Sequence, residues 1–264
     1  MVFKNRMEMK TKICVYVALA AILTVTAVTR VLTAAPDAQA VEIARGMMQA
    51  MGGESAWKQA RYVRFDFRLT VRGQVKLARA HLWDKQTGRY RLEDRSAPGQ
   101  VVVMLFNISG QQGTTYVNGK KLEGPAAATA LKGACRAYRT DIDWLALPWD
   151  WLAPGVHLKY VGEKSLQEQT FDLVEVTVDR PAGAPATRYS SYVSRRSHLL
   201  EHCSVGADTS LWDWQYATAG GIQLAADHTN TQRRSSISMG NVRVLDKVDD
   251  AFLTDPEHRL AMLK

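Results

Sequence analysis

Apolar and polar residues alternate without a break from Val63 to Arg72. The apolar positions of this segment are Val63, Phe65, Phe67, Leu69 and Val71, and arginine, aspartate or threonine stands between them. Side chains on a β-strand point alternately to opposite faces, so the pattern predicts a strand with one apolar and one charged face. Such a strand is typical of an antiparallel sheet that faces water on one side.

Most of the remaining chain predicts further strands joined by short turns. Asn118-Gly119 is a pair that adopts the positive φ angles of a type I′ hairpin turn. The segment 100–108, QVVVMLFNI, is apolar on both faces and predicts a central, covered strand. We expect a mainly β fold with helices (α+β), a strongly curved antiparallel open barrel of roughly 10–12 strands wrapped over helices.

Two segments carry the period of a helix instead. Apolar residues recur at steps of three and four within 41–60 and again within 126–147, which Pro125 precedes. The second segment is the one long internal helix, and we expect it to lie across the sheet. A proline-bounded loop, PWDWLAPG, follows it and carries Trp149 and Trp151.

The chain begins with a segment that differs from the rest. Residues 1–40 have a basic start, an unbroken apolar run and a stretch of small residues. This order is that of a secretory signal peptide, so we expect cleavage after Ala40, or less favourably after Ala35, and a periplasmic single domain over 41–264. The alternative is an inner-membrane anchor through 13–33, although the apolar run is shorter than the ~20 residues that a spanning helix needs.

Composition changes this picture little. The chain has 264 residues, of which 46% are hydrophobic and 23% charged, as in an ordinary globular protein. Five basic and two acidic residues fall within 1–40, so the whole-chain charge of +8 leaves +5 on 41–264. That charge is typical of a solvated surface, and the alternative is attraction to an anionic membrane surface. Cys135 and Cys203 form one disulfide or remain two separately buried thiols.

The stretch SHLLEH, residues 197–202, contains the H-x-x-E-H pattern of an inverted zinc-protease motif. That motif requires a helix, but the alternation before it and the turn SRRS predict the returning strand of a hairpin. On a strand, Glu201 would point away from His198 and His202. We therefore expect no metal here. The chain also lacks nucleotide-binding and serine-hydrolase motifs and the basic, aromatic surface of a nucleic-acid binder.

The order of several segments resembles a known family. After the signal and a short helix come MGGESAWKQARYVRFDF, RYSSYVSRRSHLLEHCSV, WDWQYATAGGIQLAADHT and NVRVLDKVDDAFLTDP. Over most of 41–256 the chain resembles an uncharacterised branch of the outer-membrane lipoprotein carrier superfamily (LolA/LolB/LppX-like). The resemblance implies an unclosed barrel around an apolar cavity for acyl chains. It also implies lipid or lipoprotein partners, with transient contacts to a membrane surface or envelope proteins.

We therefore expect a non-enzymatic periplasmic carrier or binding protein that needs no cofactor. The alternatives are an envelope stress sensor or protein-interaction module, and a hydrolase with an unrecognised site. Strand residues on the apolar face and tryptophans near the long helix are expected to line the cavity, and plain core packing is the competing interpretation of each. These residues are Phe65, Phe67, Leu69, Val71, Val102, Met104, Phe106, Trp144, Trp149, Trp151, Trp212 and Trp214.

Overall fold

The structure, a computed structural model, describes residues 37–109, 112–180 and 185–263. Most of the predicted signal peptide therefore lies outside the described residues. Within the described ranges, no helix combines the length and the apolar character that crossing a membrane requires.

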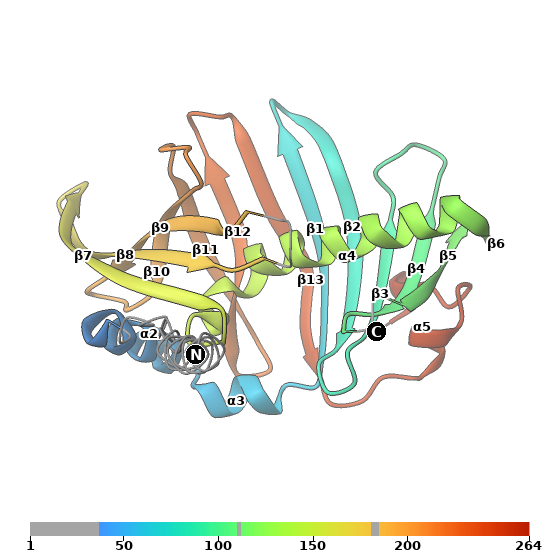
Figure 1. The fold of residues 1–264 in the computed structure, drawn as a ribbon, viewed down its shortest axis with the longest axis horizontal. Helices are drawn as coiled ribbons and strands as arrows, with labels where there is room; N and C mark the ends of the chain where they lie inside the picture. The colour runs from blue at the N-terminus through green and yellow to red at the C-terminus, as the bar shows by residue number, and fades with distance from the viewer. Residues whose placement is uncertain (1–36, 110–111, 181–184, 264) are drawn as a thin grey trace, which may run out of the picture. The chain divides into compact units, whose positions relative to one another are not determined.

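The described residues form one antiparallel sheet, whose thirteen strands follow the order β6-β5-β4-β3-β2-β1-β13-β12-β11-β10-β9-β8-β7. Because β6 and β7 are edges that do not pair with each other, the curved sheet stays open, as predicted (Figure 1). The strands are β1 (Tyr62–Val71), β2 (Gln74–Asp84), β3 (Arg89–Asp94), β4 (Val102–Asn107), β5 (Gln112–Val117), β6 (Lys120–Lys121), β7 (Val156–Leu166), β8 (Gln169–Val178), β9 (Thr187–Ser194), β10 (Leu200–Val205), β11 (Trp212–Ala219), β12 (Ile222–Asn230) and β13 (Ser235–Leu245).

Local sequence sets the turns and bulges of this sheet. Asn118 and Gly119 have φ angles of 46° and 81°, which confirms the predicted I′ geometry. The pairing of β1 with β13 shifts between Arg64 and Asp66, next to Gly240. The segment predicted to form a central strand is β4, which lies only two strands from an edge and is covered by a helix.

The helices are α2 (Ala38–Ala50), α3 (Glu54–Gln59), α4 (Gly124–Ala146) and α5 (Ala251–Thr254), with 3₁₀ turns η1 (Leu147–Asp150) and η2 (Leu260–Met262). Figure 1 shows α4 crossing the strands on one face of the sheet, as predicted for the long helix. We call this the concave face. The segment of α5 and η2 covers part of the opposite, convex face.

Two apolar clusters fill the space between α4 and the sheet. The larger one combines α2, the C-terminal half of α4 and η1 with strands on both sides of β1. The smaller one lies under the N-terminal half of α4, against β3 and β4. Cys203 belongs to the first cluster and Cys135 to the second, and both are free, buried thiols. Of the two alternatives for these cysteines, the disulfide is therefore not formed.

The SHLLEH stretch is not helical. Its last residues belong to β10, as predicted, where His202 contacts Asp213 at 2.8 Å. His198, however, lies in the preceding turn with a φ angle of 58°, so it does not share a strand face with His202. The SRRS turn is followed by two further residues, His198 and Leu199, before β10 begins at Leu200.

Helix α2 begins before the predicted cleavage site. Asp37 is its N-cap: the carboxylate accepts hydrogen bonds from the Ala40 amide at 3.1 Å and from the Tyr160 amide of β7 at 2.9 Å. Ala40 itself is fully buried. Cleavage after Ala40 would remove this cap and the first turn, whereas cleavage after Ala35 would keep both.

Candidate functional site beneath helix α4

The residues predicted to line a cavity all come from the concave side of the fold, but they do not surround one space. Phe65, Phe67 and Leu69 pack in the larger cluster, whereas Val102, Met104 and Phe106 pack in the smaller one. Val71, at the end of β1, is half-buried and belongs to neither cluster. In this conformation the strand residues therefore form solid core under α4.

Trp149 and Trp151 were expected to line the cavity from a proline-bounded loop. They are 4% and 1% exposed, because the segment after α4 continues as η1 and turns back into the core. Trp149 stacks on Trp57 with ring centroids 5.3 Å apart, and its indole N–H donates to the Gln223 carbonyl at 3.1 Å. Trp149 therefore links α3 and η1 to β12, and Trp151 is buried in the same apolar cluster.

The other three tryptophans meet at the C-terminal half of α4. The Trp144 ring lies 4.9 Å from Trp212 and 5.9 Å from Trp214, measured between centroids. His228 of β12 completes the group, at 4.4 Å from Trp214 and 5.1 Å from Trp144. Trp144 and Trp212 are only partly buried, so this aromatic cluster reaches the surface beside α4.

A hollow of about 160 Å³ opens at this cluster, between α4 and strands β9 to β11. Trp144, Trp214 and Val205 form its apolar side, and Thr140 stands at the exposed rim on α4. Asp143, Arg180, Thr187 and Tyr189 form its polar side. We call this the helix pocket. It has one aromatic wall and one charged wall, an arrangement suited to the apolar end of an amphipathic ligand.

The charged wall is a closed network. Arg180 donates to the Asp143 carboxylate, and Tyr189 donates its hydroxyl proton to the same carboxylate at 2.9 Å. Burial raises the pKa of Asp143, and the Arg180 guanidinium opposes that rise. Burial also raises the pKa of Tyr189, so it remains a neutral donor. These contacts link α4 to β9, and we call them the first clamp.

A second clamp holds the other side of the same helix turn. Asp141 is fully buried, and its oxygens lie 3.1 and 2.9 Å from Nη1 of Arg79. Nε2 of His81 lies 3.3 Å from the same carboxylate, while its Nδ1 contacts the Tyr90 hydroxyl at 2.8 Å. Burial lowers the pKa of His81 below its usual value. Arg79 is the cationic partner of Asp141, and it also pairs with Asp94 at 3.2 Å.

His228 is a buried polar group beside the helix pocket. Neither ring nitrogen has a hydrogen-bond partner among the described residues. Burial lowers the pKa of His228 to about 3, and the nearby Trp144 backbone offsets only part of that effect. The ring is therefore neutral at physiological pH and acts as an aromatic wall rather than as a proton carrier.

The groups around this site include a buried thiol, aromatic rings and an ion pair. Burial raises the pKa of Cys203 to about 12, so its thiol stays protonated and is a poor nucleophile. Among the described residues, no three His, Cys, Asp or Glu side chains are grouped as metal ligands. The site offers aromatic surface, a fixed ion pair and a covering helix.

Sequence reasoning identified the tryptophans but missed both clamps. Arg79 and His81 occupy the strand positions that face Phe67 and Phe65, so charged side chains stand on an otherwise apolar face. That departure from alternation is the signal that a buried acid would be needed nearby. Asp141 and Asp143 flank Ile142 on α4, and each meets a different arginine.

No protein-family model and no curated protein matches this chain. Solved structures do. The chain is similar to a DUF1329 family protein from Desulfovibrio piger, with 11% identity, a TM-score of 0.47, and 83% of this chain and 98% of that one covered. It is similar to a putative outer membrane lipoprotein-sorting protein domain from Vibrio parahaemolyticus, with 11% identity, a TM-score of 0.44, and 82% and 97% covered.

A LolA superfamily protein from Nitrosomonas europaea matches with 12% identity and a TM-score of 0.40, over 78% of this chain and 97% of that one. The resemblance predicted from the sequence is thus found again in the structural comparison. At this identity the likeness is one of fold alone.

Proposed function

We propose that this protein is a non-enzymatic binding protein of the bacterial envelope, exported to the periplasm, that holds an acyl chain of a lipid or lipoprotein beneath α4. The observation that carries the proposal is the helix pocket, an aromatic hollow at the edge of an apolar concave face. The site has no activated nucleophile, which fits binding rather than catalysis.

The size of the pocket limits what it holds in the closed conformation. Its volume of about 160 Å³ is close to the ~150 Å³ of an engineered cavity that admits one benzene molecule. Only the end of an acyl chain fits such a space. Each additional methylene buried would contribute about 0.8 kcal/mol, so a longer chain gains by extending under the helix. In our proposal α4 moves away from the sheet to admit the rest of the chain.

The attachment of α4 supports this movement. Its exposed N-terminal half is rich in alanine and buries little beyond Ala134 and Cys135. Its C-terminal half is held by two polar clamps, through Asp141 and Asp143, and by apolar packing of Ile142 and Leu145 in the larger cluster. When the helix lifts, water can replace the polar contacts and the acyl chain can replace the apolar ones. In this proposal α4 is therefore the element that moves to open the concave face.

A matched pair of threonines on α4 tests the pocket. Thr140 and Thr129 are both exposed, and each hydroxyl donates to the carbonyl four residues earlier, at 3.1 and 2.9 Å respectively. Thr140 stands at the rim of the helix pocket, and Thr129 lies about three turns away. Thr140→Trp would fill the pocket, and Thr129→Trp is the control for adding an indole to the same helix.

The assay is fluorescence titration with dansyl-labelled undecanoic acid, together with native mass spectrometry of protein purified from the envelope. We expect the wild type and Thr129→Trp to bind the probe and Thr140→Trp to bind it at least about tenfold more weakly. Tenfold corresponds to about 1.4 kcal/mol, less than the contribution of two methylenes. Equal binding by all three proteins would reject the helix pocket as the site, and no binding by the wild type would reject the proposed function.

A further inference from the structure

A second pair of hollows lies on the convex face, away from α4. The first, of about 320 Å³, has its floor on three neighbouring strands, β2, β1 and β13. The second, of about 280 Å³, continues it toward the C-terminal segment and shares Asp66, Arg95 and Asn241 with it. We call the two together the convex groove. The helix pocket shares no lining residue with the convex groove, although Phe67 and Arg79, which pack beneath α4 and hold it, also border the groove.

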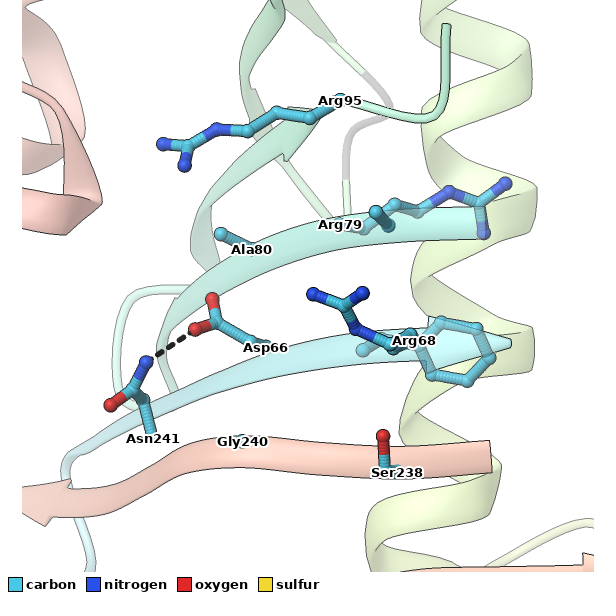
Figure 2. A pocket seen from close by; sticks show the side chains of 10 residues that line it. Asp66, Arg68, Arg79, Ala80, Arg95, Ser238, Gly240 and Asn241 are labelled. Carbon is cyan, nitrogen blue, oxygen red and sulfur yellow. Dashed lines mark hydrogen bonds between the residues drawn. The ribbon is translucent and has the colours of Figure 1, made fainter. Parts of the chain in front are cut away.

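Small side chains create the groove. Ala78 and Ala80 of β2 pair with Arg68 and Asp66 of β1 across the sheet, and Ser238 and Gly240 of β13 pair with the same two residues from the other side. Figure 2 shows the resulting strip, with Arg68 and Arg95 extending over it and Arg79 reaching the other way. The larger neighbours therefore stand as walls above a low floor.

The walls are strongly basic. Arg64, Arg68, Arg95 and Arg243 line the groove, whereas Asp66 is the one carboxylate among the lining residues. Asp66 is already engaged, by Nη2 of Arg64 at 2.7 Å and by the Asn241 side-chain amide. Glu93, just outside the groove, pairs with Arg95 at 2.6 Å and with Arg91 at 2.9 Å. Positive charge remains in excess after these pairs are counted.

Arg64 shows that the excess is built into the fold. Its side chain is only 6% exposed, and its Nη1 is buried without a hydrogen-bond partner among the described residues. Leaving such a charged donor buried without an acceptor is energetically unfavourable. A mobile surface arginine would avoid that cost by turning to water. A bound anion beside Arg64 would remove it.

We propose that the convex groove is a binding site for a phosphate group. Guanidinium groups form paired, charge-assisted hydrogen bonds with phosphate oxygens, and several arginines around one hollow suit a group with more than one negative charge. The side-chain amide of Asn241 adds a neutral polar group to the same wall. The phosphate belongs either to a small soluble phosphate ester or to a phospholipid headgroup.

Arg95 is the position to change, because its side chain is 43% exposed and its buried partner Glu93 keeps Arg91 as a second cation. Arg95→Gln removes one charge from the groove. Arg188→Gln removes one charge from an exposed position of β9 and serves as the control. Gly240→Leu keeps every arginine but occupies the floor; the new Cβ would meet Asp66 Cβ at 3.7 Å, an ordinary contact.

Calorimetry with inorganic phosphate and with glycerol 3-phosphate measures the site in solution. We expect the wild type and Arg188→Gln to bind, and Arg95→Gln to bind about tenfold more weakly or worse, as for the loss of one charged hydrogen bond. Gly240→Leu should lose binding as well. If the wild type binds neither inorganic phosphate nor glycerol 3-phosphate, or if Arg95→Gln and Arg188→Gln lose affinity equally, the proposal is overturned.

Flotation with phosphatidylglycerol vesicles, against phosphatidylcholine vesicles, distinguishes the two sources. Flotation that Arg95→Gln and added phosphate both abolish assigns the groove to a headgroup. Binding of the soluble esters without flotation assigns it to a small ligand. Flotation that responds equally to Arg95→Gln and Arg188→Gln reports net charge alone and contradicts a specific site. The test is independent of the acyl-binding assay, so the two proposals can fail separately.

Discussion

The second clamp gives the sharpest test of how α4 is held. Asp141 is fully buried and contacts Nη1 of Arg79 through both oxygens. Asp141→Asn keeps the shape of the side chain but removes its charge. Arg79 then retains only Asp94, at 3.2 Å, as an anionic partner. The variant therefore leaves the largely buried guanidinium of Arg79 with one of its two carboxylate partners.

Removing one partner of a buried ion pair costs about 3–5 kcal/mol. Because Asp94 remains and the asparagine oxygen still accepts one hydrogen bond, we expect the lower end, about 3 kcal/mol. For a domain of this length each kcal/mol corresponds to about 2–4 °C in Tm. Urea denaturation and calorimetry of the protein starting at Pro36 measure both quantities.

The double variant Arg79→Met, Asp141→Leu is the control, because it replaces the ion pair by apolar side chains. Replacing both charges by hydrophobic residues of similar volume is often neutral or stabilising, so we expect this variant to recover most of the stability that Asp141→Asn loses.

We also expect Asp141→Asn to bind more dansyl-labelled undecanoic acid, since a loosened helix exposes the concave face. A free energy of unfolding within about 0.5 kcal/mol of wild type would refute the reasoning, because it would mean that Asp141 does not anchor α4.

Three further outcomes follow from the structure. The pKa of His228 is lowered to about 3 in the folded chain, so below pH ~6.5 the unfolded chain binds a proton that the folded chain does not. This residue should therefore lower the free energy of unfolding by up to about 1.4 kcal/mol per pH unit as the pH falls from about 6.5 toward 3. Urea titrations over that range should show a smaller pH dependence of stability for His228→Leu, and an unchanged pH dependence would contradict the assignment. A protein that begins at Val41 should melt at a lower temperature than one that begins at Pro36, because it lacks the helix cap and the buried Ala40; equal melting temperatures would show that the first turn of α2 is dispensable. Cys135 and Cys203 should resist a thiol reagent in the native state and both react after denaturation without reductant, whereas no reaction after denaturation would indicate a disulfide.

Local patterns in the sequence predicted those parts of the fold that depend on neighbours along the chain. The alternation through Phe65 and Phe67 placed β1 and its apolar face correctly, because strand periodicity is set within the strand itself. The turn at Asn118 and the long helix α4 were likewise local properties of backbone conformation and apolar spacing. The number of strands came out slightly low because β6 has only two residues, Lys120 and Lys121, and no pattern of its own.

The contacts that shape both candidate sites join distant parts of the sequence. Arg79 and Asp141 are 62 positions apart, and Asp66 and Asn241 are 175 apart. Strand order and register decide such meetings, and a one-residue shift in register would send each side chain to the other face. The sequence could not show that the predicted lining residues pack as solid core, for the same reason: whether apolar side chains enclose a space or fill it depends on volumes contributed by several strands and a helix together.

The sheet separates the two proposed sites, and this has a consequence for function. Phe67 faces α4 on the concave side, while its neighbours Asp66 and Arg68 face the convex groove. One lipid molecule cannot insert its acyl chain under α4 and place its own phosphate in the groove, because the strands lie between them. The two sites must therefore bind separate ligands, or the groove must contact a membrane surface while the concave face holds an acyl chain.

The effects of substitutions at distant sites without shared partners are additive. Thr140→Trp should therefore leave phosphate binding unchanged, and Arg95→Gln should leave binding of the dansyl probe unchanged. If either substitution weakens both ligands by similar factors, the sites are coupled through the sheet, and the separation argued from strand parity is wrong.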